Sequence, residues 1–299
     1  MYSNALIPVV ISVIIIFTVG KKYCFNFSFD VQEWKRTIIL AIPLLPHYLS
    51  LVILNQADKL MIRSYCGPTE TALYSVAHTS GLIMTIVNTS INSTYVPWSY
   101  LKIKEGKGSD IKRITSVLVG LVMVLNVAVI WIAPEIISVL AAPEYRDSIW
   151  CFAPIAMSVL FYFIYTLFVD IEIYYGANKM IAIASCFAAA LNLLLNYIFI
   201  PLYGYVAAAY TTLFSYFTTM LLHYIFMLFT LKRNNQTQAF FNIPIIIVFS
   251  IIFLSVSFGA LFFYNTTLVR IAVFVLMILG VIFSRNRIIN TIKLIVNRQ

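Results

Sequence analysis

The chain has 299 residues, of which 62% are hydrophobic and only 10% are charged. Soluble domains carry about 25% charged residues, so this composition excludes a water-soluble fold and places the chain in a lipid bilayer. The net charge of +9 comes from basic residues in short segments between apolar runs. No such segment is long enough to follow a phosphate backbone, so the sequence argues against a nucleic-acid partner.

Nine apolar runs approach the roughly 20 residues that a helix needs to cross a bilayer core. In chain order they are residues 4–20, 38–57, 72–98, 114–133, 149–170, 180–200, 205–230, 242–264 and 266–284. Membrane β-strands alternate polar and apolar residues, and these runs are too continuously apolar for that pattern. The sequence therefore predicts an all-α fold, a polytopic integral membrane helix bundle of about nine transmembrane helices. The first run ends in Lys21 and Lys22 instead of a cleavage site, so we expect it to be a retained helix.

The basic residues predict how the chain is oriented in the membrane. Of the 20 lysines and arginines, only Lys59, Arg63, Arg146 and Arg270 fall in the loops on one side of the predicted bundle. The positive-inside rule assigns the richer side to the cytoplasm. We therefore expect a multi-pass protein with its C-terminus in the cytoplasm.

Enzyme motifs are absent from the sequence. It contains no Walker A loop, no G-x-S-x-G, no H-E-x-x-H and no G-x-G-x-x-G. The sequence therefore predicts no catalytic residue, no cofactor and a function other than that of an enzyme.

The cysteines and histidines are scattered and do not predict a metal site. The cysteines are Cys24, Cys66, Cys151 and Cys186, and the histidines are His47, His78 and His223. Free thiols are one reading of the cysteines. Because Cys66 and Cys151 both fall at the predicted outer face, a disulfide between them is the other. The histidines are expected to be packing residues.

Polar side chains inside the predicted helices are candidates for a functional path, since they cost free energy unless they face a partner or water. A stripe in the third run contains Thr85, Asn88, Thr89, Asn92 and Ser93. A stripe in the seventh run contains Thr211, Ser215, Thr219 and His223, and Asn192 and Asn196 lie one turn apart in the sixth. Two interpretations stay open, a hydrated path and interhelical hydrogen bonds worth about 0.6 kcal/mol each.

Charged residues are few within the runs. Asp58, Lys59 and Arg63 cluster at the outer end of the second run, whereas Asp170 and Glu172 lie at the inner end of the fifth. Each could be an ordinary charge at the headgroup level. Alternatively, lysine and arginine suit a phosphate, and a buried carboxylate suits a cation or a proton. The substrate-path candidates are Asp58, Lys59, Arg63, Asn88, Asn92, Asp170, Asn192 and Asn196.

Three stretches of the sequence resemble a known family. They are Gly176–Met180 (G-A-N-K-M), Ala190–Tyr210, and Asn55–Pro97 with its Asp58, L-M-I, Gly67 and Tyr-Ser. They are similar to the polysaccharide flippases (O-antigen type) of the multidrug/oligosaccharidyl-lipid/polysaccharide exporter superfamily. The resemblance covers nearly the whole chain.

The resemblance implies two six-helix lobes, sometimes followed by two more helices, around a central cavity that opens to alternate sides. On this mapping, residues 1–22 hold the last helix of an incomplete first lobe and 23–37 form a cytoplasmic linker. Residues 38–230 form the second lobe, 242–284 form two additional C-terminal helices, and 285–299 form a basic cytoplasmic tail. Because about five helices of the first lobe are missing from this mapping, a separate first-lobe chain is one expected partner.

The resemblance also implies a function. This is the export of lipid-linked oligosaccharide units across the bacterial cytoplasmic membrane for surface polysaccharide, such as the O-antigen of lipopolysaccharide. The expected partners are the lipid-linked oligosaccharide and membrane lipids. The alternatives are a multidrug-type antiporter, a membrane polysaccharide enzyme, and a partner that does not itself transport. The short outer links argue against the enzyme, which commonly needs a sizeable external loop or paired external carboxylates.

Overall fold

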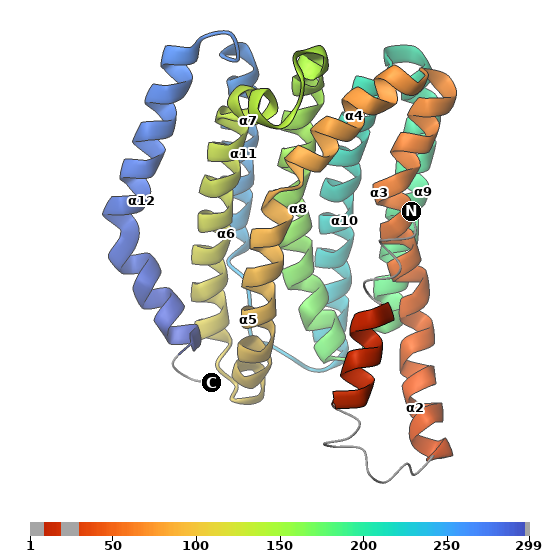
Figure 1. Cartoon of the computed structure of the whole chain (residues 1–299). Coiled ribbons are helices and arrows are strands. Elements are labelled where there is room, and N and C mark those ends of the chain that lie inside the picture. Colours follow the sequence, from red (N-terminus) through yellow and green to blue (C-terminus); the bar gives the residue numbers. More distant parts are fainter. Residues whose placement is uncertain (1–8, 19–29, 297–299) are drawn as a thin grey trace. The chain divides into compact units, whose positions relative to one another are not determined.

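The computed structural model describes residues 9–18 and 30–296. The chain divides into two compact units, Met1–Ile42 and Pro43–Gln299. The described residues form helices joined by turns, with no β-strand among them (Figure 1). This confirms the predicted all-α fold.

The first unit contains two described helices. One spans Val9–Thr18 and the other, α2, spans Val31–Ala41. The carboxylate of Asp30 accepts hydrogen bonds from the backbone N–H groups of Gln32 at 2.8 Å and Glu33 at 3.3 Å. These bonds satisfy two of the donors that a helix start leaves free, so Asp30 fixes where α2 begins. The predicted linker 23–37 is therefore helical from Val31 onward, and its residues 23–29 lie outside the described residues.

The second unit is a bundle of helices. Its helices are α3 (Leu45–Tyr65), α4 (Pro68–Gly81), α5 (Met84–Lys104), α6 (Gly108–Trp131), α7 (Ala133–Leu140), α8 (Ile149–Tyr174), α9 (Asn178–Tyr203), α10 (Tyr205–Arg233), α11 (Ile243–Phe262) and α12 (Thr267–Val296). Short 3-10 turns occupy Ile42–Leu44 and Pro143–Ser148. Among the described residues, five helices are long and apolar enough to cross a membrane: α6, α8 with the turn before it, α9, α10 and α11. The chain is thus a multi-pass membrane protein, and the count of nine stays a prediction.

Three predicted segments differ from the helices observed. Run 38–57 is interrupted by the 3-10 turn Ile42–Leu44, where Pro43 and Pro46 limit helical hydrogen bonding. Run 72–98 divides at Leu82 and Ile83 into α4 and α5. The predicted tail 285–299 continues α12 as helix through Val296.

Gly81 lies where the end of α4 approaches α8 closely. A Cβ at this position would lie 2.9 Å from Cγ2 of Ile155, so the end of α4 approaches α8 more closely than any larger residue allows. The backbone N–H of Leu82 bonds back to the carbonyl of His78 at 3.1 Å and closes the last turn. α4 and α5 therefore meet α8 as two separate segments.

Helix α8 is the centre of the second unit. It contacts α10, α6, α4, α5, α11 and α9, and it lies between α6 and α10 in Figure 1. In its most apolar 18-residue window, 89% of the residues are buried, against 28% for α11. Most of the apolar surface of α8 therefore meets protein, whereas that of α11 is left for lipid.

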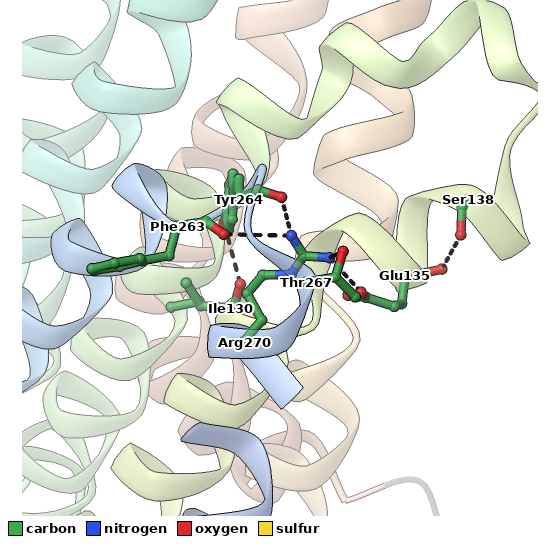
Figure 2. A network of polar contacts seen from close by, with 7 residues as sticks. All are labelled: Ile130, Glu135, Ser138, Phe263, Tyr264, Thr267 and Arg270. Carbon is green, nitrogen blue, oxygen red and sulfur yellow. Dashed lines mark hydrogen bonds and ion pairs between the residues drawn. The ribbon is translucent and has the colours of Figure 1, made fainter. Parts of the chain in front are cut away.

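A polar network fixes the loop between α11 and α12 to the end of α6 (Figure 2). The guanidinium of Arg270 donates to a carboxylate oxygen of Glu135 at 2.5 Å and to the backbone carbonyl of Tyr264. The Tyr264 hydroxyl donates to the carbonyl of Ile130 at 3.2 Å. Arg270 is only 4% exposed, so its charge is held by these acceptors and not by water. The network joins α12 to α6 and α7.

No disulfide joins the cysteines in the part of the chain that the structure describes. Cys66, Cys151 and Cys186 are all free thiols. The alternative of a disulfide between Cys66 and Cys151 is therefore wrong. Cys24 lies outside the described residues.

Candidate functional site

Asp58 is a fully buried carboxylate at the junction of four helices. It lies on α3, and its Oδ2 accepts hydrogen bonds from the Tyr74 hydroxyl of α4 at 2.5 Å and the Thr212 hydroxyl of α10 at 2.7 Å. Its Oδ1 accepts from the side-chain amide of Asn196 on α9 at 2.6 Å. Both carboxylate oxygens therefore have protein donors, which is how a membrane interior tolerates a carboxylate.

Further amide and hydroxyl groups extend this arrangement. The amide of Asn196 also donates to Oδ1 of Asn192 at 3.2 Å, and the Thr211 hydroxyl donates to Oδ1 of Asn196. The side-chain nitrogen of Asn192 is buried with no hydrogen-bond partner in the part of the chain that the structure describes. We define the Asp58 cluster as Asp58, Tyr74, Asn192, Asn196, Thr211 and Thr212. Its oxygen atoms are hard ligands of the kind that suit a small cation, and its carboxylate suits a proton.

The other predicted residues of this region lie outside the hydrogen-bonded cluster. Lys59 is half-buried and close enough to Asp58 for an electrostatic interaction, whereas Arg63 is exposed. Neither forms an ion pair within the described ranges. The structure thus brings Asp58, Asn192 and Asn196 together and leaves Arg63 at the surface.

A second group of predicted residues lines a pocket of about 240 Å³ between α5 and α8. We call it the α5–α8 pocket, and its lining residues are Asn88, Thr89, Asn92, Ser93, Val96, Tyr162 and Thr166. The amide of Asn88 donates to the Val159 carbonyl at 3.1 Å, which fixes its orientation. The Oδ1 atoms of Asn88 and Asn92 are buried and accept no hydrogen bond from any described residue.

Asp170, on the inner half of α8, lies outside the lining of this pocket but contacts its lining residue Asn92. The side-chain amide of Asn92 hydrogen-bonds its carboxylate, and its Oδ2 has no donor among the described residues. Asp170 is only 6% exposed. The pocket residues Asn88 and Asn92 and the adjacent Asp170 thus hold three buried acceptors without a described donor, and buried acceptors of this kind call for a partner. A ligand with several hydroxyl groups would supply the missing donors.

The sequence did not predict the contact between Glu172 and His223. Oε2 of Glu172 on α8 lies 3.1 Å from Nδ1 of His223 on α10, and both side chains are fully buried. The sequence alone predicts Glu172 as a helix-end charge or as a buried carboxylate for a cation or a proton, and His223 as a packing residue in a polar stripe. One sequence pattern does indicate that His223 is buried. Thr212, Ser215, Thr219 and His223 follow one another at three- and four-residue spacing, so the histidine lies on the same buried face of α10 as Thr212, which donates to Asp58.

Comparisons with known proteins give three similarities. Residues 2–100 match the family model described as "Polysaccharide biosynthesis protein". Protein 1 of the Lsg locus of Haemophilus influenzae is 24% identical over 168 residues, which are 55% of this chain and 41% of that protein. A MOP superfamily transporter of Pyrococcus furiosus with a solved structure is 20% identical, with a TM-score of 0.46 over 74% of this chain and 51% of that one.

This chain spans about half the length of the relatives that it matches, 41% of one and 51% of the other. The family match lies in the N-terminal third and includes α3 with Asp58 and α5 with Asn88 and Asn92. The family match supports, for residues 2–100, the predicted similarity to proteins of polysaccharide biosynthesis.

Proposed function

From the premise that this multi-pass membrane protein is similar to the polysaccharide biosynthesis family, we propose that it forms part of a flippase. The substrate is a lipid-linked oligosaccharide, and the step is its export across a bacterial cytoplasmic membrane for surface polysaccharide such as O-antigen. The second unit acts as the second lobe. A first lobe, on this or on a separate chain, supplies the opposite wall of the path.

The observation that carries the proposal is the α5–α8 pocket. Six of its seven lining residues carry an amide or hydroxyl group, and the Oδ1 atoms of Asn88 and Asn92 accept no hydrogen bond from any described residue. Sugars are rich in hydroxyl donors, which match these acceptors. A site for lipophilic drugs would instead be lined mainly by hydrophobic and aromatic side chains. The lining therefore favours an oligosaccharide over the substrates of a multidrug antiporter.

The Asp58 cluster is proposed as the site where an ion gradient drives the cycle. Asp58 receives hydrogen bonds from α4, α9 and α10 while lying on α3. A proton or a small cation bound there would replace or rearrange these bonds, and so would change how the four helices pack. A ligand shifts a conformational equilibrium by its difference in affinity for the two states, and this rearrangement provides such a difference.

Binding of the sugar can be tested on Asn92. We expect the purified chain in lipid nanodiscs to bind an undecaprenyl-diphosphate-linked oligosaccharide more tightly than sugar-free undecaprenyl diphosphate. Asn92→Ala removes one pocket group, and a hydrogen bond contributes about 0.5–1.5 kcal/mol, so affinity should fall by up to about tenfold. The measurement is the concentration dependence of the thermal unfolding temperature.

Ser90→Ala is the matched control for this test. Ser90 is an exposed residue of α5 whose hydroxyl donates to the Ile86 carbonyl at 2.8 Å, and it does not line the pocket. Its replacement should leave the affinity unchanged. Equal affinity for the lipid with and without sugar would contradict the proposal, and tight binding of lipophilic cations instead would favour the antiporter.

A further inference from the structure

The Glu172–His223 pair is fully buried between α8 and α10. Both side chains are inaccessible, and the one contact recorded between them joins Oε2 to Nδ1 at 3.1 Å. The remaining polar atoms, Oε1 of Glu172 and Nε2 of His223, are buried without any described partner. Unpaired buried polar atoms are costly, so their retention at both ends of one pair points to a function.

The net charge of such a pair is fixed by its surroundings. A bilayer interior strongly disfavours a net charge, so the pair is stable when glutamate and histidine together are neutral. This condition requires the two residues to share one ionisable proton. Either His223 is a protonated imidazolium beside the Glu172 carboxylate, or Glu172 is a protonated carboxyl group beside a neutral imidazole. Loss of that proton leaves a charge of −1, which is tolerable only where water reaches the pair.

Aromatic and histidine side chains surround the pair. The ring of Tyr165 stacks on His223 with centroids 5.3 Å apart, and Tyr216 stacks on the other side of Tyr165 at 6.3 Å. His47 of α3 lies close enough to interact electrostatically with His223, and its Nδ1 is 2.6 Å from the Ser185 hydroxyl of α9.

The other ionisable groups on the neighbouring helices form no ion pair with Glu172 or His223 among the described residues. On the inner turns of α5, α6 and α9 they are Lys102, Lys104, Asp110, Lys112, Arg113 and Lys179, and none forms an ion pair with Glu172 or His223. On α4, His78 contacts Tyr74 instead, and α11 carries no ionisable side chain. Asp170 lies two residues from Glu172 on α8 and thus faces another side of the helix. The pair is isolated from other countercharges.

The position of the pair relates it to the Asp58 cluster. His223 follows Thr212 by eleven positions on α10, which at 1.5 Å per residue places it about 16 Å away along the helix. Glu172 is two residues before the end of α8, the end that the positive-inside rule assigns to the cytoplasm. Between the two sites, the buried hydroxyls of Ser215 and Thr219 continue the same face of α10.

We propose that Glu172 and His223 form a second proton-binding site of the lobe, separate from the Asp58 cluster and close to the cytoplasmic side. The pair holds one proton while α8 and α10 exclude water. It releases that proton to water, leaving Glu172 ionised and His223 neutral, when the cytoplasmic end of the lobe opens. The inference rests on the proposed function, because it assigns the release to the transport cycle.

The test measures protons released when substrate binds. The full chain in nanodiscs, in a weakly buffered solution with a pH-sensitive dye, receives undecaprenyl-diphosphate-linked oligosaccharide. We expect the wild type to release about one proton more per bound lipid than Glu172→Gln, since the two residues titrate as one coupled pair. Glu172→Gln should still bind the lipid. Glu144→Gln, which removes an exposed carboxylate of the Pro143–Ser148 turn, should behave as the wild type.

A rescue variant distinguishes loss of the proton site from misfolding of a single variant. The exchanged double variant Glu172→His with His223→Glu keeps one carboxylate and one imidazole in contact, so it should restore proton exchange that either single variant loses. Binding without proton exchange in the wild type, or undiminished exchange in Glu172→Gln, would overturn the inference while leaving the proposed function intact. Absence of sugar-dependent binding in the wild type would instead remove the proposed function.

The proton site can also be examined without substrate. Nitrogen-15 NMR of the three histidine rings reports which nitrogen carries a proton, and His223→Asn identifies the His223 signals. We expect the state of His223 to change in Glu172→Gln. A His223 ring with the same state in both proteins would mean that the two side chains share no proton.

Discussion

At the scale of single residues, Tyr74 supplies one of three donors to the buried carboxylate of Asp58. Tyr74→Phe keeps the ring and removes the hydroxyl, and a hydrogen bond to a charged group contributes about 1.5–3 kcal/mol. We expect the variant to lower the thermal unfolding temperature in nanodiscs. Tyr197→Phe, on a side chain that is 64% exposed, should leave it unchanged. Equal unfolding temperatures would show that Asp58 does not depend on this donor.

At the scale of elements, Arg270 determines how α12 is attached to the end of α6. Arg270→Ala removes the donors to Glu135 and Tyr264, and the lost hydrogen bonds contribute about 1–3 kcal/mol. Hydrogen exchange in the loop between α11 and α12 should become roughly 5- to 150-fold faster, because local opening then costs less free energy. Arg285→Ala, on an exposed side chain of the same helix, is the control. Unchanged exchange in the Arg270 variant would assign the attachment to apolar packing alone.

At the scale of the whole molecule, the distribution of basic residues predicts which loops face the cytoplasm. A cysteine placed at exposed Gln236, in the link between α10 and α11, should react with an impermeant maleimide only after the cells are permeabilised. A cysteine at exposed Glu144 should react on intact cells. The labelling of the unmodified protein, which has four native cysteines, is subtracted from the labelling of each variant. The reverse pattern would invert the topology and move Glu172 to the outer side.

Sequence reasoning reached the helices more easily than the contacts between them. Run length and hydropathy predicted α6, α8, α9, α10 and α11 to within a few residues at most ends, because each is a continuous apolar segment. The division between α4 and α5 was not predicted, since Leu82 and Ile83 are as apolar as a helix interior. Asp58 was predicted as a candidate, but its bond to Thr212 joins residues 154 positions apart, and such pairing leaves no periodic signal.

The central place of α8 has a consequence for the order in which the protein is made. Glu172 precedes its partner His223 by 51 residues, so α8 is synthesised well before α10. At a synthesis rate of about 5–20 residues per second, His223 is added roughly 3 to 10 s after Glu172. A mean hydropathy of 2.0 lets α8 rest in lipid during that interval, although 89% of its most apolar window is finally hidden from lipid. The apolar surface of this helix thus serves biosynthesis first, as a temporary membrane anchor, and becomes the core of the lobe afterwards.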